Sequence, residues 1–215
     1  MRNMKHLIIL GAGGFARDVF NFAINSKGYN ELFDVKGFLD INLHSLDGFS
    51  GYPPILGSEN DYDIQEGDVF ITAVGDNKLR KKIVDVIVSK GGKFITLIHQ
   101  TAVIHTNAKI GEGCIIQPNT VIGADTNTGS HTYIQNGAIL GHDVRVGSFC
   151  RIDCNVMFVG GTLCEDFVTV HTNSVINHNV VVGENAVVGA CSFVIRKVKP
   201  GITVFGIPAK KIAFN

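Results

Sequence analysis

A histidine followed directly by an aspartate, His142 and Asp143, is the residue pair in this chain best suited to acid–base chemistry. An unperturbed imidazole has a pKa of about 6.5, so it is mostly neutral at pH 7 and accepts a proton readily. A neighbouring carboxylate can set its tautomer and orientation. A lone histidine on a turn is more often an ordinary surface residue, so the role of His142 depends on what the fold brings next to it.

The chain around this pair has a period of six residues. Ile, Leu or Val occupies 13 of the 16 positions of a series that starts at Ile104 and advances in steps of six to Val194. Small or β-branched residues occupy all 16 positions four residues further on, from Ala108 to Val198. Glycine follows the aliphatic residue directly at seven of the 16 positions. Repeats of this kind predict a left-handed parallel β-helix, in which the aliphatic residue points inward, the small residue packs at an inner corner and the glycine frees the backbone to turn.

Three hexapeptides make one triangular coil, so residues 18 apart are expected to stack at about 4.8 Å per coil. Gly160 then lies one coil above His142, which leaves room for a thioester between a backbone amide and a base. His178 lies two coils above, at about 10 Å. Zinc–nitrogen bonds are about 2.0–2.1 Å long, so these two imidazoles are not expected to share a metal ion.

The first hundred residues follow a different pattern, in which apolar runs alternate with segments of helical spacing. The expected strands are Leu7–Leu10, Val35–Leu39, Val69–Val74 and Phe94–Ile98, and the expected helices are Phe15–Asn25 and Lys78–Lys90. The segment Asn42–Tyr62 is expected to be an irregular loop. Alternation predicts a small Rossmann-like α/β domain over residues 1–100, with its ligand beyond the carboxyl ends of the strands, followed by the β-helix domain over 101–215.

A glycine-rich loop, Gly11-Ala12-Gly13-Gly14, follows the first expected strand. It falls short of the full dinucleotide fingerprint, so a phosphate-cradling loop at a helix N-terminus is favoured over a nicotinamide site. Asp40 ends the second expected strand and can accept hydrogen bonds from a base or ribose. Its alternative role is that of a turn-initiating aspartate.

The bulk composition excludes several classes of function. A formal net charge of +0 and a pI of about 7.1 give no support for nucleic-acid or membrane-surface binding. No apolar run is long enough to span a bilayer and no signal peptide is recognised, so a cytoplasmic location is expected. The five cysteines form no CxxC pair, so neither a zinc site nor a disulfide framework is expected.

Five motifs together make the chain resemble the hexapeptide-repeat acyltransferases that act on nucleotide-linked aminosugars and on sialic acid. They are Gly11–Phe15, Gly37–Asp40, Ala73–Asn77 with Arg80, Gly141–Asp143 and Gly206–Lys210. Their order and spacing are more specific than any one of them. This chain has Arg151 at the position where the family often has a second histidine.

The resemblance implies a homotrimer that binds acetyl-CoA as a co-substrate in clefts between subunits, with no metal. It implies that His142 is the general base, supported by Asp143, and that the amide of Gly160 contacts the acetyl carbonyl. The implied acetyl-CoA contacts are Gly160, Gly161, Gly189, Ala190 and Lys210. The implied nucleotide-sugar contacts in the first domain are Gly11, Gly13, Gly14, Phe15, Asp40, Gly75 and Asn77.

The function expected from the sequence is acetyl-CoA-dependent N-acetylation of the amino group of a nucleotide-linked 4-amino sugar, in the biosynthesis of a cell-surface polysaccharide. One alternative is O-acetylation of sialic acid or a related sugar hydroxyl. Another is a non-catalytic, nucleotide-sugar-binding trimeric scaffold. The His142–Asp143 pair favours catalysis over the scaffold.

Overall fold

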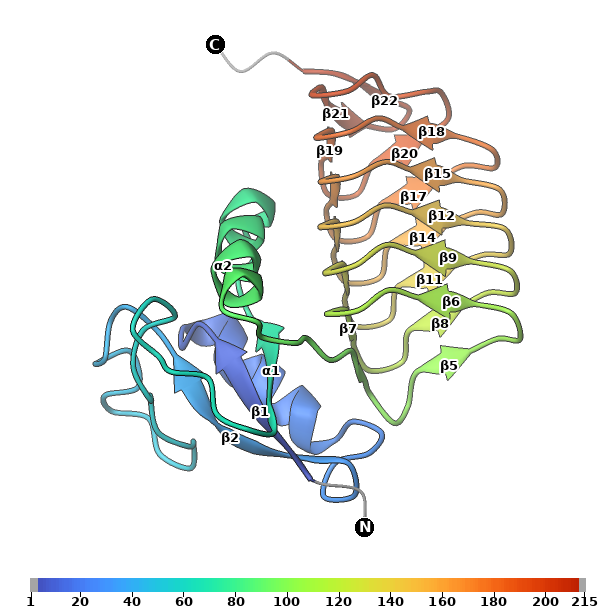
Figure 1. Cartoon of the computed structure of the whole chain (residues 1–215). Helices are drawn as coiled ribbons and strands as arrows, with labels where there is room; N and C mark the ends of the chain where they lie inside the picture. The colour runs from blue at the N-terminus through green and yellow to red at the C-terminus, as the bar shows by residue number, and fades with distance from the viewer. Residues whose placement is uncertain (1–3, 213–215) are drawn as a thin grey trace. The chain divides into compact units, whose positions relative to one another are not determined.

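The computed structural model describes residues 4–212, and the chain divides into two units, Met1–Gln100 and Thr101–Asn215. The outermost residues of the two expected domains, 1–3 and 213–215, lie outside the described residues. The expected fold class is confirmed, because a small unit of strands and helices is followed by a parallel β-helix (Figure 1).

The first unit is built around a three-stranded parallel sheet with the order β2-β1-β3. Its elements are β1 (Lys5–Leu10), α1 (Gly14–Ile24), β2 (Phe33–Leu39), β3 (Asp68–Thr72), α2 (Asn77–Ser89) and β4 (Leu97–Ile98). The central strand β1 is buried from Leu7 to Leu10, as an apolar run covered on both faces must be. Helix α1 buries Ala16, Val19 and Ala23, whose spacing puts them on one helix face.

The expected strand Phe94–Ile98 is only partly formed. Phe94 makes an isolated parallel bridge with Phe70, framed by hydrogen bonds from Phe70 N to Lys93 O (2.9 Å) and from Ile95 N to Phe70 O (3.0 Å). These two bonds seat the Phe94 ring in the core, 6.2 Å from the Phe70 ring, and the pairing ends there. The regular strand β4 begins only at Leu97. The expected loop is irregular, with one bridge from Ile55 to Phe38.

The second unit is a triangular prism of stacked coils. Its two-residue strands are β5 (Val103–Ile104), β6 (Lys109–Ile110), β7 (Ile115–Ile116), β8 (Val121–Ile122), β9 (Asn127–Thr128), β10 (Tyr133–Ile134), β11 (Ile139–Leu140), β12 (Arg145–Val146), β13 (Arg151–Ile152), β14 (Met157–Phe158), β15 (Leu163–Cys164), β16 (Thr169–Val170), β17 (Val175–Ile176), β18 (Val181–Val182), β19 (Val187–Val188) and β20 (Phe193–Val194). A hairpin of β21 (Thr203–Gly206) and β22 (Ala209–Lys211) follows them. From β5 to β20 the paired strand residues lie 18 residues apart, as expected; Tyr133, for example, pairs with Ile115 and Arg151. In the last turn the spacing falls to 16, since Val198 bridges Val182 and Thr203 pairs with Val187.

The strands form three faces that meet at three corners. Face 1 contains β5, β8, β11, β14, β17 and β20; face 2 contains β6, β9, β12, β15 and β18; face 3 contains β7, β10, β13, β16, β19 and β21. Corner 1 joins faces 1 and 2, corner 2 joins faces 2 and 3, and corner 3 joins faces 3 and 1. In Figure 1 the coils stack from the green β5 to the red β20, and the β21–β22 hairpin covers the C-terminal end of the stack.

The repeating glycine does not turn the backbone, so that part of the sequence interpretation is wrong. The left-handed residue of each corner lies two positions later, from Asn107 (φ 65°) to Cys191 (φ 57°), and is mostly Asn, Asp or Gly. The repeating glycine lies instead directly beneath the next coil. A Cβ on Gly123 would lie 2.5 Å from the carbonyl carbon of Gly141, and one on Gly147 would lie 2.7 Å from the Asp166 amide. The glycine therefore allows the coils to stack closely.

A polar network anchors one side of the first unit. The Asp68 carboxylate has a fully buried side chain and accepts hydrogen bonds from Lys36 Nζ (2.7 Å), the Tyr62 hydroxyl (2.8 Å) and the Gln65 amide (2.8 Å). Burial alone would raise the pKa of Asp68, but the bonds from Lys36, Gln65 and Tyr62 outweigh it and lower that pKa. The ionised form is therefore the one that the folded state prefers.

We expect Asp68→Asn to lower the free energy of unfolding by about 1–3 kcal/mol at pH 7, because a buried charge-assisted network loses its acceptor. A carboxyl whose pKa is lowered by folding stabilises the protein above its unfolded pKa of about 3.9, and that stability is lost as the pH falls through the folded pKa. The difference between wild type and variant should therefore shrink below about pH 4, as measured by urea unfolding. The exposed ion pair of Lys81 and Asp85 offers a control, since Asp85→Asn should cost less than about 0.5 kcal/mol at any pH. A loss at Asp68 that does not depend on pH would contradict this account.

Candidate active site

His142 and Asp143 lie at corner 1 of the prism, where the chain passes from β11 to β12. Asp143 is the left-handed residue of this corner (φ 59°), a conformation that aspartate tolerates better than most residues. Its Oδ2 lies 2.7 Å from His142 Nδ1, and both side chains are 66% exposed. A carboxylate can only accept here, so Nδ1 carries the proton and Nε2 of the neutral ring is left as a proton acceptor.

Gly160 lies one coil above His142, as the 18-residue period predicts. A Cβ at Gly160 would lie 2.5 Å from His142 Nε2 and 2.6 Å from Cε1, so the imidazole rests directly on this glycine. The expectation of room for a thioester between the two is wrong for this conformation, because the ring already fills that space. A thioester can reach both groups from the side, or after the exposed imidazole rotates about its side-chain bonds.

The amide of Gly160 is a hydrogen-bond donor that the coils do not use. The amide of the equivalent corner residue in each coil lies outside the backbone ladder. At corner 2 such amides are capped by side chains, since Ser130 N donates to Ser148 Oγ (3.2 Å) and Ser148 N to Asp166 Oδ1 (2.7 Å). Within residues 4–212, the Gly160 amide has no such acceptor. A proton acceptor, His142 Nε2, and an unused donor therefore lie side by side, which is the pairing that acyl transfer requires.

The other expected acetyl-CoA contacts are divided between two corners and the hairpin. Gly161 is the left-handed residue of corner 1 (φ 74°), beside Gly160. Gly189 and Ala190 lie at corner 3, on the far side of face 1, where a Cβ on Gly189 would meet the Phe205 ring at 2.6 Å. Lys210 lies in β22, opposite Phe205. A single chain therefore brings Gly160 and Gly161 to His142, but not Gly189 or Ala190.

A cationic pocket lies at the C-terminal end of the prism. It has a volume of about 430 Å³, and its lining combines Val194, Val198, Ile202, Val204 and Ala209 with the cations Arg196, Lys197, Lys199 and Lys211. Alternation along β22 places Ala209 and Lys211 on the pocket side and Lys210 on the other. Arg196 lies 54 residues after His142, on the same corner and three coils further along. Lys197, Lys199, Lys210 and Lys211 are close together in the sequence, but only the strand register shows that Lys210 does not line the pocket.

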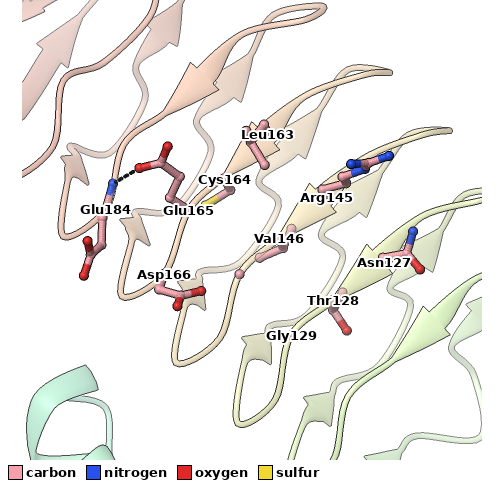
Figure 2. Close-up of a pocket in the computed structure, with 11 residues that line it drawn as sticks. Asn127, Thr128, Gly129, Arg145, Val146, Leu163, Cys164, Glu165, Asp166 and Glu184 are labelled. Carbon is pink, nitrogen blue, oxygen red and sulfur yellow. Dashed lines mark hydrogen bonds between the residues drawn. The ribbon is translucent and has the colours of Figure 1, made fainter.

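A larger groove of about 560 Å³ lies on face 2 and does not include His142 or Gly160. Figure 2 shows its side chains, with Asn127, Arg145 and Leu163 along one side and three carboxylates, those of Glu165, Asp166 and Glu184, along the other. The dashed line marks the Glu184 amide donating to Glu165 Oε2 (2.8 Å). Among the described residues, no group of three or more His, Cys, Asp or Glu side chains is arranged to hold a metal ion.

In the first unit, the expected nucleotide-sugar residues gather at the carboxyl ends of the strands. Asp40, which follows β2, accepts hydrogen bonds from Ala12 N (2.7 Å, to Oδ2) and from Asn42 N (2.8 Å, to Oδ1). Gly11 (φ 102°) lies against the loop after β3, because a Cβ there would be 3.3 Å from Ala73 O. Gly13 is the N-cap of α1 and has open space around it. Asp40 thus organises the glycine loop whether or not it also contacts a ligand.

The loop after β3 is held from inside by a buried arginine. Arg80 is fully buried and donates to Val74 O (3.1 Å) and to Asn77 Oδ1 (2.9 Å). This contact fixes the segment that contains Gly75 and Asn77. A second cation near the glycine loop, Arg17, was not expected from the sequence, and its guanidinium lies 3.6 Å from the centroid of the Phe49 ring. Phe15 is the second residue of α1 and is partly exposed.

Comparison with known proteins agrees with this architecture. Residues 6–87 match the PglD N-terminal domain family, and residues 161–196 match the bacterial transferase hexapeptide family (six repeats). GDP-perosamine N-acetyltransferase from Escherichia coli O157:H7 is 27% identical over 154 residues, which cover 66% of this chain and 67% of that protein. UDP-N-acetylbacillosamine N-acetyltransferase from Bacillus subtilis is 33% identical over 117 residues, which cover 53% of this chain and 51%, about half, of that protein.

Among solved structures, PerB from Caulobacter crescentus in complex with CoA and GDP-perosamine aligns with a TM-score of 0.88 at 25% sequence identity. The alignment covers 97% of both chains. The coiled prism is the architecture of hexapeptide-repeat acyltransferases, and the hexapeptide match agrees with it. Within that class, the chain is similar to nucleotide-aminosugar N-acetyltransferases in both of its units.

We expect Gly160→Ala to slow acetyl transfer by about 10²-fold, because the added methyl group would displace the imidazole from its place beside the amide. Gly160 does not have a left-handed backbone, so alanine is conformationally tolerated and the thermal unfolding midpoint should change little. The double variant with His142→Ala should be no slower than His142→Ala alone, because both changes remove the same interaction. Steady-state turnover of the three variants makes this comparison, and additive losses would contradict it.

Proposed function

We propose that this protein transfers the acetyl group of acetyl-CoA to the amino group of a nucleotide-linked 4-amino sugar, with His142 as the general base. The observation that carries the proposal is the geometry at corner 1. There Asp143 holds Nδ1 of the imidazole at 2.7 Å, and Nε2 lies against Gly160, whose amide is unused within residues 4–212. The named N-acetyltransferases among its relatives support the choice of an amine as acceptor.

The reaction follows from these groups. The neutral amine attacks the thioester carbonyl carbon, so a C–N bond forms and the carbonyl oxygen becomes an oxyanion. His142 Nε2 takes the proton that the attacking nitrogen releases, and Asp143 stabilises the imidazolium through Nδ1. The Gly160 amide donates to the oxyanion. The C–S bond then breaks, and the imidazolium returns the proton to the departing thiolate, which leaves as CoA.

The first unit is proposed to hold the nucleotide part of the acceptor. Gly13 and Gly14 present backbone amides at the N-terminus of α1, where no side chain caps them, and such a terminus favours a phosphate. Asp40, Gly75 and Asn77 border the same edge of the sheet, together with Gly11 and Phe15. PerB, in complex with CoA and GDP-perosamine, supports a nucleotide-sugar ligand for a protein of this architecture.

Acetyl-CoA is proposed to run along corner 1. With the acetyl group at His142 and Gly160, three coils of about 4.8 Å place Arg196 about 14 Å further along the same corner. The cationic pocket around Arg196, Lys199 and Lys211 then receives phosphate groups. Lys210 remains a proposed contact from the outer side of the hairpin, and no metal is assigned a role.

The composition of face 1 supports a homotrimer. All six of its outward residues are apolar: Val103, Val121, Ile139, Met157, Val175 and Phe193. Val103 is 50% exposed and Met157 is 40% exposed. Face 2 carries Lys109, Asn127 and Arg145 at three of its five equivalent positions, with Leu163 and Val181 at the other two. Three copies with face 1 turned toward a common axis would bury these residues. Corner 1 of each copy would then adjoin corner 3 of the next, and Gly189 and Ala190 would join the site.

The cytoplasm is the proposed location. All five cysteines are free thiols, as is usual in a reducing compartment. No helix within residues 4–212 has the length and apolar character needed to cross a membrane.

We expect His142→Ala to lower the turnover number by about 10²–10⁴-fold, because the base is lost while the binding residues remain. His178→Ala, a histidine at the same corner two coils away, is the matched control and should keep near-normal turnover. The affinity for acetyl-CoA, measured by titration calorimetry, should be little altered in both. Near-normal turnover of His142→Ala with an aminosugar nucleotide would refute the mechanism.

We expect Met157→Glu to break the trimer, because a carboxylate in the centre of an apolar interface is buried without a partner. Asn127→Glu places the same charge on face 2 and should leave the trimer intact. Light scattering at micromolar concentration should report a monomer for the first variant and a trimer for the second. A wild-type protein that is a stable monomer would remove the basis for a shared site.

A further inference from the structure

An arginine beside the glycine loop has no polar partner for its guanidinium in the protein. Arg17 is the fourth residue of α1, and its Nη2 is 3.8 Å from the position that a Cβ on Gly14 would occupy. Within residues 4–212 this guanidinium donates no hydrogen bond and forms no ion pair. Arg80, the other arginine near this edge of the sheet, is buried and donates to Val74 and Asn77. Arg17 therefore supplies an uncommitted cation near the carboxyl ends of the strands.

The guanidinium is held in place by an aromatic ring. Its central carbon lies over Phe49, 3.6 Å from the ring centroid, which is the arrangement of a cation–π contact. Phe49 lies in the irregular loop after β2, where its amide donates to Leu46 O (3.0 Å) within the loop itself. Tyr52, three residues later, packs on Phe20 of α1 with ring centroids 5.4 Å apart and anchors the end of the loop. A stacked guanidinium has already lost rotamer freedom, so it binds an acceptor at little entropic cost.

The neighbours of Arg17 place it at one end of the glycine loop. Asp40 lies at the other end, where it accepts a hydrogen bond from Ala12 N (2.7 Å). A nucleotide whose ribose lies at Asp40 and whose first phosphate lies at the amides of Gly13 and Gly14 would extend its second phosphate toward Arg17. The planar fork of arginine donates two parallel N–H bonds to a phosphate. A contact that only attached the loop to α1 would need no cation, since an aliphatic side chain also packs on a phenyl ring.

We propose that Arg17 is a specificity-determining residue that binds the second phosphate of the nucleotide, so that the first unit selects a nucleoside diphosphate over a nucleoside monophosphate. Phe49 is a positioning residue that holds the guanidinium beside the glycine loop. This inference rests on the proposed function and names its acceptor more narrowly, as an aminosugar carried by a nucleoside diphosphate. It also gives a role to a half-exposed ring, since Phe49 is 50% exposed.

Titration calorimetry with matched nucleotides tests the selection. The probes are UDP with UMP and GDP with GMP, because two relatives of this chain are named for GDP-linked and UDP-linked sugars. We expect Arg17→Met to weaken binding of the diphosphate by about 10–100-fold and that of the matching monophosphate by less than about threefold. Arg17→Lys should keep part of the preference, because it retains a cation. Lys27→Met removes an exposed cation beyond the other end of α1 and is the matched control. Equal losses for both nucleotides, or no loss, would overturn the proposal.

Phe49→Leu tests the positioning role. We expect it to weaken diphosphate binding by about 3–10-fold in the wild-type background and to have no effect in the Arg17→Met background, because the ring acts through the guanidinium. An equal loss in both backgrounds would overturn the positioning role of Phe49. Unfolding midpoints should change little, since Tyr52 still anchors the loop, and the affinity for acetyl-CoA should not change. A wild-type protein that binds neither UDP nor GDP would instead refute the nucleotide site of the proposed function, so the two failures are distinguishable.

Discussion

The interaction on which the rest of the second unit depends is the parallel backbone ladder between residues 18 apart. It stacks residue on residue, so each corner becomes a column in which chemistry is repeated or varied at intervals of about 4.8 Å. His142, Gly160, His178 and Arg196 share one such column. No insertion interrupts the 18-residue period from β5 to β20, and only the last turn, from Val182 to Val198, is two residues shorter. Functional residues are therefore obtained by substitution at corners and outward positions.

The stacking of the coils also explains why glycine is needed at two kinds of position. The repeating glycines admit the backbone of the next coil, as at Gly123, and Gly160 admits the His142 ring instead. Elsewhere aromatic rings fill the corner. His131, Phe149 and Phe167 all have positive φ and stack at 5.0 and 5.3 Å, so ring contact offsets a backbone conformation that these residues rarely adopt. The corners are thus sites of packing, strain and chemistry at once.

The coil period and the His142–Gly160 contact could be predicted from the sequence, because a strict repeat converts spacing into distance without further information. The role of the repeating glycines could not be predicted. Glycine is favoured both where the backbone has a positive φ and where another backbone approaches closely, and only the dihedral angles of the structure distinguish the two reasons. Lys210 and Lys211 are neighbours with equal charge, and only the register of β22 shows that Lys211 lines the pocket. The hydrogen bonds of the Asp153 carboxylate with Gln135, Arg151 and His171 could not be predicted either, because the stacking of the coils brings these residues together and no sequence motif links them. In the first unit, the alternating pattern predicted the bounds of both helices to within a residue or two. It did not predict that the expected strand from Phe94 would pair only through a single bridge before β4 begins at Leu97.

A stack of parallel strands has two open ends, and each end coil presents unpaired amides and carbonyls that can accept another strand. The β21–β22 hairpin covers the C-terminal end, where β21 pairs with β19 in parallel and β22 reverses direction. An antiparallel strand of three residues, two of them lysine, is a poor template for a further parallel coil, and its charges repel a second copy of the same end. The hairpin thus limits growth: it keeps a fold that is periodic along its axis from continuing, end to end, into a fibre.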